Sequence, residues 1–382
     1  MALAAACGLI AANLYYAQPL IGLIGPSLGL PVEAAGLVVT LTQIGYCLGL
    51  ALVVPLGDLL ENRRLITTIL CVTAAALAAA CLAPTISVFL AACLAIGVSS
   101  VVAQILVPLA AHLAPDASRG RVVGNVMSGL LVGILLARPV SSLIAHEAGW
   151  RPVFGLSAAA MLILALALRR ILPVRNPDHD SSYLALLRSL WTLFINSPLL
   201  RRRAICHAAL FAAFSLFWTG VPLLLASPIF GLTQRGIAFF ALAGAAGALI
   251  APVAGRFADR GWTRAGMGIA MLIVAGSFIL AHIAGRGSMV LLVAAVILLD
   301  LGVQSNMVLS QRQIYGIDAA ARSRLNGIFM AIFFAGGALG SALASWSYAV
   351  GGWSLLSWIG CAFGVVALIL YGFEFLGGRR TT

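Results

Sequence analysis

Apolar runs close to membrane-spanning length recur from one end of this 382-residue chain to the other, with short arginine-bearing segments between them. A helix needs roughly 20 mostly apolar residues to cross a bilayer. Only 9% of the residues are charged, against about 25% in a typical soluble protein. The runs therefore predict a multi-pass membrane protein whose main partner is the lipid bilayer. Helix is the expected element, because an open sheet cannot satisfy its backbone in lipid.

We predict twelve helical spans from these runs. Their approximate limits are residues 2–24, 35–56, 65–83, 86–112, 122–145, 152–172, 204–226, 235–256, 264–284, 287–312, 323–348 and 353–376. The longest polar stretch, residues 173–203, separates six spans from six. We predict an N-terminal bundle over residues 1–172, a cytoplasmic linker over 173–203 with a short helix on the membrane surface, and a C-terminal bundle over 204–382.

The two halves of the chain repeat a set of residues. Each member of the set has its counterpart 203 residues later, and the pairs are Arg119 and Arg322, Arg121 and Arg324, Gly124 and Gly327, Met127 and Met330, Gly133 and Gly336, and Trp150 and Trp353. The repeat predicts an all-α membrane protein with twelve transmembrane helices in two pseudo-symmetric six-helix bundles. This plan is typical of secondary transporters.

The positions of the basic residues predict the orientation in the membrane. All 23 are arginines. If both termini are cytoplasmic, eighteen fall in cytoplasmic segments and three outside, at Arg151, Arg235 and Arg286. The positive-inside rule therefore favours cytoplasmic termini. Because the arginines lie between spans, the net charge of +12 does not indicate a nucleic-acid partner.

Two loops repeat a glycine, an aspartate and then arginines. They contain Gly57, Asp58, Arg63 and Arg64 after the second span, and Gly255, Asp259, Arg260 and Arg264 after the eighth. These loops resemble the signature loop of the major facilitator superfamily. With Arg119, Arg121, Arg322 and Arg324 they form the candidate cytoplasmic gate. A glycine lets two helix ends approach closely, and a carboxylate can pair with an arginine or a helix N-terminus to hold that face closed. Charges simply solvated in loops are the alternative.

Further segments extend the resemblance along the whole chain. They are Asn13–Leu20, Val39–Tyr46, Gly133–Arg138, Leu299–Gln304 and Ala321–Asn326. Together they look like the twelve-helix, drug:proton antiporter-like bacterial branch of the superfamily. This resemblance implies a bacterial inner-membrane protein that moves a small molecule by alternating access, with proton-coupled efflux as the expected mode.

Two positions depart from that branch. Its proton-linked members often carry an arginine four residues before a glycine in the fourth span, where this chain has Cys93 before Gly97. In the fifth span, Arg138 stands before Pro139 in place of a glycine. The alternatives are therefore a facilitator or symporter of a small metabolite, and a receptor or scaffold that has kept the fold without transport.

Two ionisable residues lie deep within predicted spans. Arg138 is in the fifth span and Asp300 is near the middle of the tenth. A charge at this depth is costly unless it is paired or wet, so such residues are functional candidates. We predict that Asp300 couples transport to protons and pairs with Arg138 in one state. A static structural pair is the alternative.

Amide and phenol side chains within the spans are the candidate substrate-binding groups. They are Asn13, Tyr16, Gln18, Gln43, Tyr46 and Gln304. Contact between helices is the alternative role for these groups. Trp218, with Phe211, Phe214 and Phe217, either lines an aromatic pocket or faces lipid.

No Ser/His/Asp set, phosphate-binding loop or metal-spaced cluster is present in the sequence, and the seven cysteines form no CxxC pair. We therefore expect no enzymatic activity, cofactor or metal, and we expect a monomer.

Overall fold

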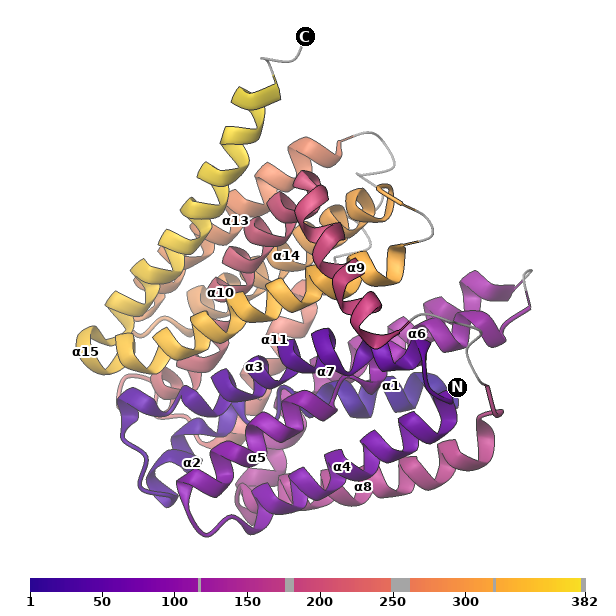
Figure 1. The fold of residues 1–382 in the computed structure, drawn as a ribbon. Helices are drawn as coiled ribbons and strands as arrows, with labels where there is room; N and C mark the ends of the chain where they lie inside the picture. The colour runs from indigo at the N-terminus through magenta and orange to yellow at the C-terminus, as the bar shows by residue number, and fades with distance from the viewer. Residues whose placement is uncertain (116–117, 176–181, 249–261, 319–320, 379–382) are drawn as a thin grey trace. The chain divides into compact units, whose positions relative to one another are not determined.

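The computed structural model describes residues 1–115, 118–175, 182–248, 262–318 and 321–378, and every regular element within them is a helix (Figure 1). The chain forms two compact units. Unit 1 contains Met1–Leu30 and Leu37–Thr192, and unit 2 contains Pro31–Gly36 and Leu193–Thr382. A helix, α9 (Tyr183–Asn196), begins in unit 1 and ends in unit 2.

Nine helical stretches among the described residues are long and apolar enough to cross a membrane. They are Val32–Asp58, Asn62–Leu82, Ile86–Leu113, Gly120–Ala148, Arg151–Ile171, Pro198–Ala226, Thr263–Ala284, Met289–Tyr315 and Arg322–Phe373. The remaining predicted spans do not each match one of these stretches. The first predicted span, residues 2–24, is broken after Ala12, and the eighth, residues 235–256, runs past the described residues. The last two predicted spans merge into α15 (Arg322–Gly378).

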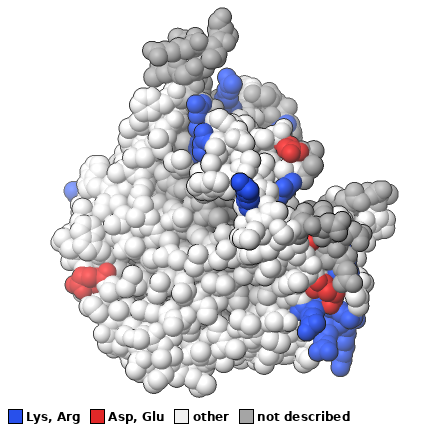
Figure 2. Space-filling view, in the orientation of Figure 1, with Lys and Arg blue, Asp and Glu red and all other residues white. Residues whose placement is uncertain are grey.

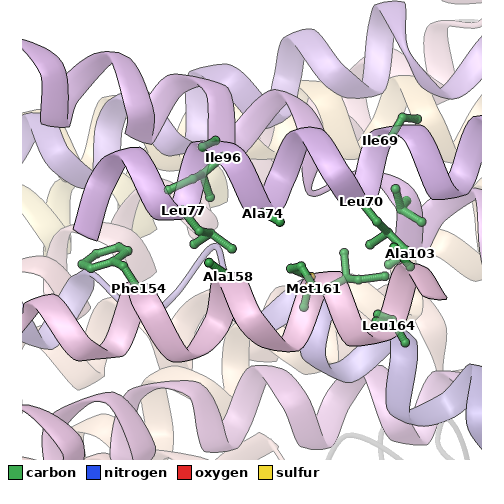
Figure 3. Packing of buried hydrophobic residues seen from close by; sticks show 14 of the residues in the cluster. Ile69, Leu70, Ala74, Leu77, Ile96, Ala103, Phe154, Ala158, Met161 and Leu164 are labelled. Atoms are coloured by element: carbon green, nitrogen blue, oxygen red, sulfur yellow. The ribbon is translucent and has the colours of Figure 1, made fainter. Parts of the chain in front are cut away.

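Unit 1 holds most of the N-terminal helices. They are α1 (Ala2–Ala12), η1 (Gln18–Leu20), α2 (Ile21–Ser27), α3 (Leu37–Leu52), η3 (Val54–Asp58), α4 (Asn62–Leu82), α5 (Ile86–Ser99), α6 (Val102–Leu113), α7 (Arg119–Ala148) and α8 (Arg151–Ile171). Its apolar core lies mainly between α4, α5, α6 and α8. Figure 3 shows Leu70 and Leu77 of α4 facing Ala158 and Met161 of α8. Small residues beside leucines let these helices pack closely.

Unit 2 holds the C-terminal helices. They are α10 (Pro198–Ala226), α11 (Gln234–Ala248), α13 (Thr263–Ala284), α14 (Met289–Tyr315) and α15, with the short η2 (Val32–Ala34) packed against α15. Helix α10 begins six residues earlier than the predicted span. Ser197 caps it by accepting a hydrogen bond from the Leu200 amide at 3.3 Å, and Pro198 occupies the first turn.

The sequence repeat has the same structural role in each unit. In unit 1, Gly133 on α7 lies against the backbone of Gly8 on α1; in unit 2, Gly336 on α15 lies against the backbone of Ala208 on α10. A Cβ atom at either glycine would come closer than 3.0 Å to that backbone, a distance that real Cβ atoms essentially never show. These two repeated glycines therefore permit equivalent helix crossings.

A second repeated pair marks equivalent breaks between helices. Gly149 has φ +80° between α7 and α8, and Gly352 has φ +61° inside α15. The tryptophan after each glycine anchors the next helix. The Trp150 indole donates to Ser27 Oγ at 2.9 Å, and the Trp353 indole donates to the Ala281 carbonyl at 2.7 Å.

Most of the surface is uncharged. Figure 2 shows broad uncharged surface on the face in view, with few charged side chains. Large apolar side chains are exposed on the spans, among them Ile163, Leu166 and Val290 at 67%, 63% and 79%. This distribution is that of helices surrounded by lipid.

Candidate functional site

The first predicted span is interrupted where its polar residues lie. Helix α1 ends at Ala12, and the chain continues through turns into η1, which begins at Gln18 with Pro19 in its first turn. Between the two elements, the amides of Asn13 and Tyr15 donate in short turns to the carbonyls of Ile10 and Ala12. The residues of the break are buried: Gln18 fully, and Asn13 and Tyr15 to 3% and 5% exposure.

Arg138 on α7 is buried against this break. Its Nε donates to Gln18 Oε1 at 2.7 Å, and its Cζ lies 4.9 Å from the centroid of the Tyr15 ring. Only 4% of the Arg138 surface is exposed. The structure therefore brings two predicted site residues, Arg138 and Gln18, into direct contact. Tyr15, which we did not predict as a site residue, completes the cluster through its ring face.

The other predicted groups of unit 1 lie elsewhere. Asn13 joins α1 to α8, because its Oδ1 accepts a hydrogen bond from Ser157 Oγ at 2.6 Å and its Nδ2 lies 3.5 Å from Met161 Sδ. Asn13 thus contacts a neighbouring helix, the alternative role considered for these amides. Tyr16 is half-buried beside the same apolar core.

Two predicted residues lie on α3. Gln43 is 1% exposed and Tyr46 is 3% exposed. The Tyr46 hydroxyl accepts a hydrogen bond from Gln104 Nε2 on α6 at 3.2 Å. Gln104 is a polar partner that the sequence analysis did not single out.

Asp300 on α14 is the buried acid of unit 2. Its Oδ1 accepts a hydrogen bond from the Trp218 indole on α10 at 3.0 Å, and only 3% of its surface is exposed. A Cβ at Gly244 on α11 would lie 3.0 Å from Asp300 Oδ2 and closer still to the Trp218 ring. Glycine at 244 therefore lets α11 close over the Trp218–Asp300 pair.

The aromatic residues of α10 do not face lipid. Phe211, Phe214, Phe217 and Trp218 are each at most 4% exposed, which excludes the lipid-facing alternative. Gln304, one turn after Asp300, is half-buried on α14. Arg138 and Asp300 belong to different units, so their predicted pairing stays a prediction.

The loop after the second predicted span, part of the candidate gate, is held together by residues that the resemblance did not identify. Buried Asn62 donates from Nδ2 to the Gly57 carbonyl at 2.6 Å, and its amide donates to the Arg175 carbonyl at 3.1 Å. Glu61 caps α4 by accepting from the amides of Arg63 and Arg64. The Asp58 side chain is exposed. The capping role of Glu61 was hard to read from the sequence, because Ser, Thr, Asp and Asn are the usual N-cap residues.

The remaining predicted gate residues are only partly described. Gly255, Asp259 and Arg260 lie outside the described residues, as does the side chain of Arg119. Of the others, Arg121 and Arg64 are exposed, and Arg63 and Arg324 are half-buried. Arg322 Nε donates to the Tyr315 carbonyl at 3.1 Å. The Arg264 carbonyl accepts from the Tyr371 hydroxyl at 2.8 Å.

Sequence reasoning also missed a buried polar cluster in unit 2. His207 on α10 is fully buried, and its ring stacks on Phe333 at 5.0 Å between centroids. His207 Nδ1 lies 3.1 Å from Asn306 Oδ1, which also accepts from Ser310 Oγ at 3.2 Å. The predicted span 204–226 leaves His207 near its end, whereas α10 begins at Pro198 and places it well inside the helix.

Among the side chains that the structure describes, no group of three or more His, Cys, Asp or Glu residues could hold a metal ion. Among the described buried polar residues, Arg138 contacts Gln18 in unit 1, and Asp300 contacts Trp218 and His207 contacts Asn306 in unit 2.

Comparison with known proteins agrees with the helical architecture. The family model described as Major Facilitator Superfamily matches residues 3–318. The uncharacterized transporter YgaY of Escherichia coli O157:H7 is 41% identical over 366 residues, which cover 96% of this chain and 93% of that protein.

Two solved structures share the fold at low sequence identity. The nucleoside transporter NupG has a TM-score of 0.80 and 17% identity, over 98% of this chain and 99% of that one. The human organic anion transporter MFSD10 has a TM-score of 0.68 and 17% identity, over 97% of this chain and 98% of that one. The chain is thus a multi-pass membrane transporter rather than an enzyme, and it belongs to the major facilitator superfamily.

Proposed function

We propose that this transporter moves a small molecule across the bacterial inner membrane by alternating access, coupled to protons and in the direction of efflux. The observation that carries the proposal is the buried Asp300 carboxylate, which accepts a hydrogen bond from Trp218 between α10, α11 and α14. An intramembrane acid is costly to keep and is typical of proton pathways.

The Trp218 contact gives Asp300 a means of coupling. A hydrogen bond to a carboxylate is about twice as strong as one between neutral groups. Protonation of Asp300 removes the negative charge and weakens the bond to the Trp218 indole. Because Trp218 also packs on Phe214, Phe217 and Phe240, such a change acts on the packing of α10 against α11. Proton binding thereby biases the conformation of unit 2.

Arg138 supplies the complementary group in unit 1. A guanidinium stays charged at any physiological pH and binds carboxylates or phosphates in a bidentate manner. Its contacts with Gln18 and Tyr15 orient it at the break between α1 and η1. We assign it the recognition of an acidic group on the substrate, which favours organic anions and zwitterions as the substrate class.

The test is flux in proteoliposomes with an imposed pH gradient, screened across organic anions, nucleosides and amphiphilic drugs. We expect the gradient to accelerate flux of at least one compound, and Asp300→Asn to abolish the acceleration while ligand binding persists. Asp318→Asn, which alters an exposed acid on the loop after α14, is the matched control. Gradient-driven flux that survives in Asp300→Asn removes Asp300 as the coupling residue.

A facilitator or symporter of a metabolite is the second candidate. The observation that favours it is Cys93 on α5, buried to 1% exposure, at the position where proton-linked relatives often carry an arginine. Flux that a pH gradient leaves unchanged supports facilitation, and uptake accelerated by an inward gradient supports symport. If no compound is transported but ligands still raise the unfolding temperature, the chain acts as a receptor.

A further inference from the structure

Helix α9 is apolar on all sides, yet the described chain does not enclose it. Its residues are aliphatic or aromatic except for Arg188, Ser189, Thr192 and Asn196. All fourteen residues of α9 are described, and none of them is buried. A helix that is hydrophobic all round is normally enclosed in a protein core or in lipid. The composition of α9 therefore calls for a cover that the described residues do not supply.

Three large apolar side chains mark the exposed face of α9. Leu184, Trp191 and Ile195 are 76%, 63% and 47% exposed. Their spacing of seven and then four residues puts them on one side of the helix. Arg188 is also exposed and lies on the same side, one turn from Leu184 and from Trp191. This face thus presents two aliphatic side chains, an indole and one long basic side chain.

Hydrogen bonds hold both ends of α9 against longer helices. At its start, the Tyr183 hydroxyl donates to the Leu52 carbonyl of α3 at 2.8 Å. At its end, Arg201 Nη1 on α10 donates to the Phe194 carbonyl at 3.1 Å and also to the Ile195 carbonyl. A cation is favourable there, because the last carbonyls of a helix lack partners within it. The exposed face is therefore carried by a helix that is fixed at both ends.

The contact at Leu52 places the start of α9 beside a span rather than beyond its end. Leu52 lies six residues before the end of the stretch Val32–Asp58, which is long and apolar enough to cross a membrane. Six residues of helix rise about 10 Å. Consecutive spans end and begin at the same face of the membrane, so the connection from Ile171 of α8 to Pro198 of α10 stays at that face. This is the level of the lipid headgroups and the adjoining acyl chains.

We propose that the exposed face of α9 lies in the bilayer interface, with Leu184, Trp191 and Ile195 against the acyl chains. Interfacial helices bury their apolar side about 5–10 Å deep, and tryptophan is enriched at this level. From there the long side chain of Arg188 reaches the lipid phosphates. No acidic residue occurs in residues 182–203 to repel anionic headgroups. Because α9 carries the chain from unit 1 into unit 2, this contact seats that connection in lipid.

Spin labels on single cysteines measure the surroundings of this face. In a background without the seven native cysteines, labels replace Leu184, Trp191 and Ile195 one at a time, in protein reconstituted into phosphatidylethanolamine–phosphatidylglycerol liposomes. Oxygen concentrates in lipid and a nickel chelate stays in water, so the ratio of their collision rates with the label reports depth. The lipid control is Ile163 on α8, which is 67% exposed, and the water control is Val174 between α8 and α9, which is 59% exposed.

We expect the oxygen-to-nickel ratio at all three α9 positions to exceed that at Val174 and to approach that at Ile163. Ratios no higher than that at Val174 would place this face in water and overturn the proposal. Labels that neither reagent reaches would mean that protein covers the face, either a second copy or another part of the chain, and would overturn it as well.

A second measurement needs one conservative substitution only. Lipids brominated on the acyl chains near the headgroup quench the fluorescence of a tryptophan that touches them. The fluorescence that Trp191 contributes is the difference between wild type, with its seven tryptophans, and Trp191→Phe. We expect that difference to fall in brominated lipid, and an undiminished difference would contradict the proposal. Neither measurement involves transport, so the outcome is independent of the proposed efflux and its coupling to protons.

Discussion

Alanine at the repeated glycines should destabilise both units by the same mechanism. Gly133 and Gly336 occupy equivalent helix crossings, α1 with α7 and α10 with α15. In each case the added Cβ meets backbone atoms of the partner helix at less than 3.0 Å. Backbone cannot rotate away as a side chain can, so one helix must shift. Overpacking of this kind costs about 1–3 kcal/mol.

The chain supplies its own control for this prediction. Gly124 and Gly327 are also a repeated pair, on the same two helices, but no atom lies within 4 Å of a Cβ added to either. Alanine at those positions should be neutral or stabilising by up to about 1 kcal/mol, because glycine is a poor helix former.

Thermal unfolding of purified protein in detergent measures the difference. A loss of 1–3 kcal/mol in a unit of this size corresponds to a fall of about 2–12 °C in the unfolding midpoint. We expect Gly133→Ala and Gly336→Ala to show that fall, and Gly124→Ala and Gly327→Ala to show none. If all four variants unfold at the same temperature, the close crossings do not exist in the protein, and the repeat has no shared structural role.

Three further predictions concern single contacts. Asn62→Ala removes the side-chain bond to the Gly57 carbonyl and the 3.4 Å contact from Arg175 Nη1 to Asn62 Oδ1, while the backbone bond to the Arg175 carbonyl stays. Trypsin should therefore cleave after Arg175 about fivefold faster, given about 1 kcal/mol per hydrogen bond; unchanged cleavage would show that this segment is held by other contacts. Glu61→Ala removes the cap of α4 and should cost about 0.5–2 kcal/mol in thermal unfolding, whereas Glu61→Asp, a residue that also caps helices, should cost less. Trp218→Phe removes the donor to Asp300 and should cost about 1.5–3 kcal/mol. The cost should be smaller in an Asp300→Asn background, and an equal cost in both backgrounds would assign the effect to packing alone.

Much of the fold could be predicted from the sequence, because lipid leaves helices as the element for a chain this apolar. The predicted span 152–172 and the observed α8, Arg151–Ile171, differ by one residue at each end. The predicted helix boundaries were wrong where turns and capping residues interrupt or extend an apolar run. Helix α1 stops at Ala12 before a series of short turns, α10 begins early at its Ser197 cap, and two spans merge around Gly352.

The candidate site was less predictable, because partners depend on which helices meet. Buried charge alone singled out Arg138 and Asp300, but nothing in the sequence indicated that Gln18 and Trp218 would be their hydrogen-bond partners. Asn13 was expected to bind substrate because amides can orient ligands, and this stays a prediction; its hydrogen-bond partners in the structure, Ser157 and Met161, lie on α8. Polarity within a span does not distinguish a ligand group from a contact between helices.

Accessibility of Gln304 from both sides of the membrane tests alternating access most directly. This residue is half-buried on α14, one turn after Asp300. Gln304→Cys in a background without the seven native cysteines can be labelled with an impermeant maleimide, applied to right-side-out and to inside-out vesicles in turn. The account predicts reaction from both sides, with a transported ligand slowing it. Labelling from one side only, whatever ligand or pH gradient is applied, would contradict the account.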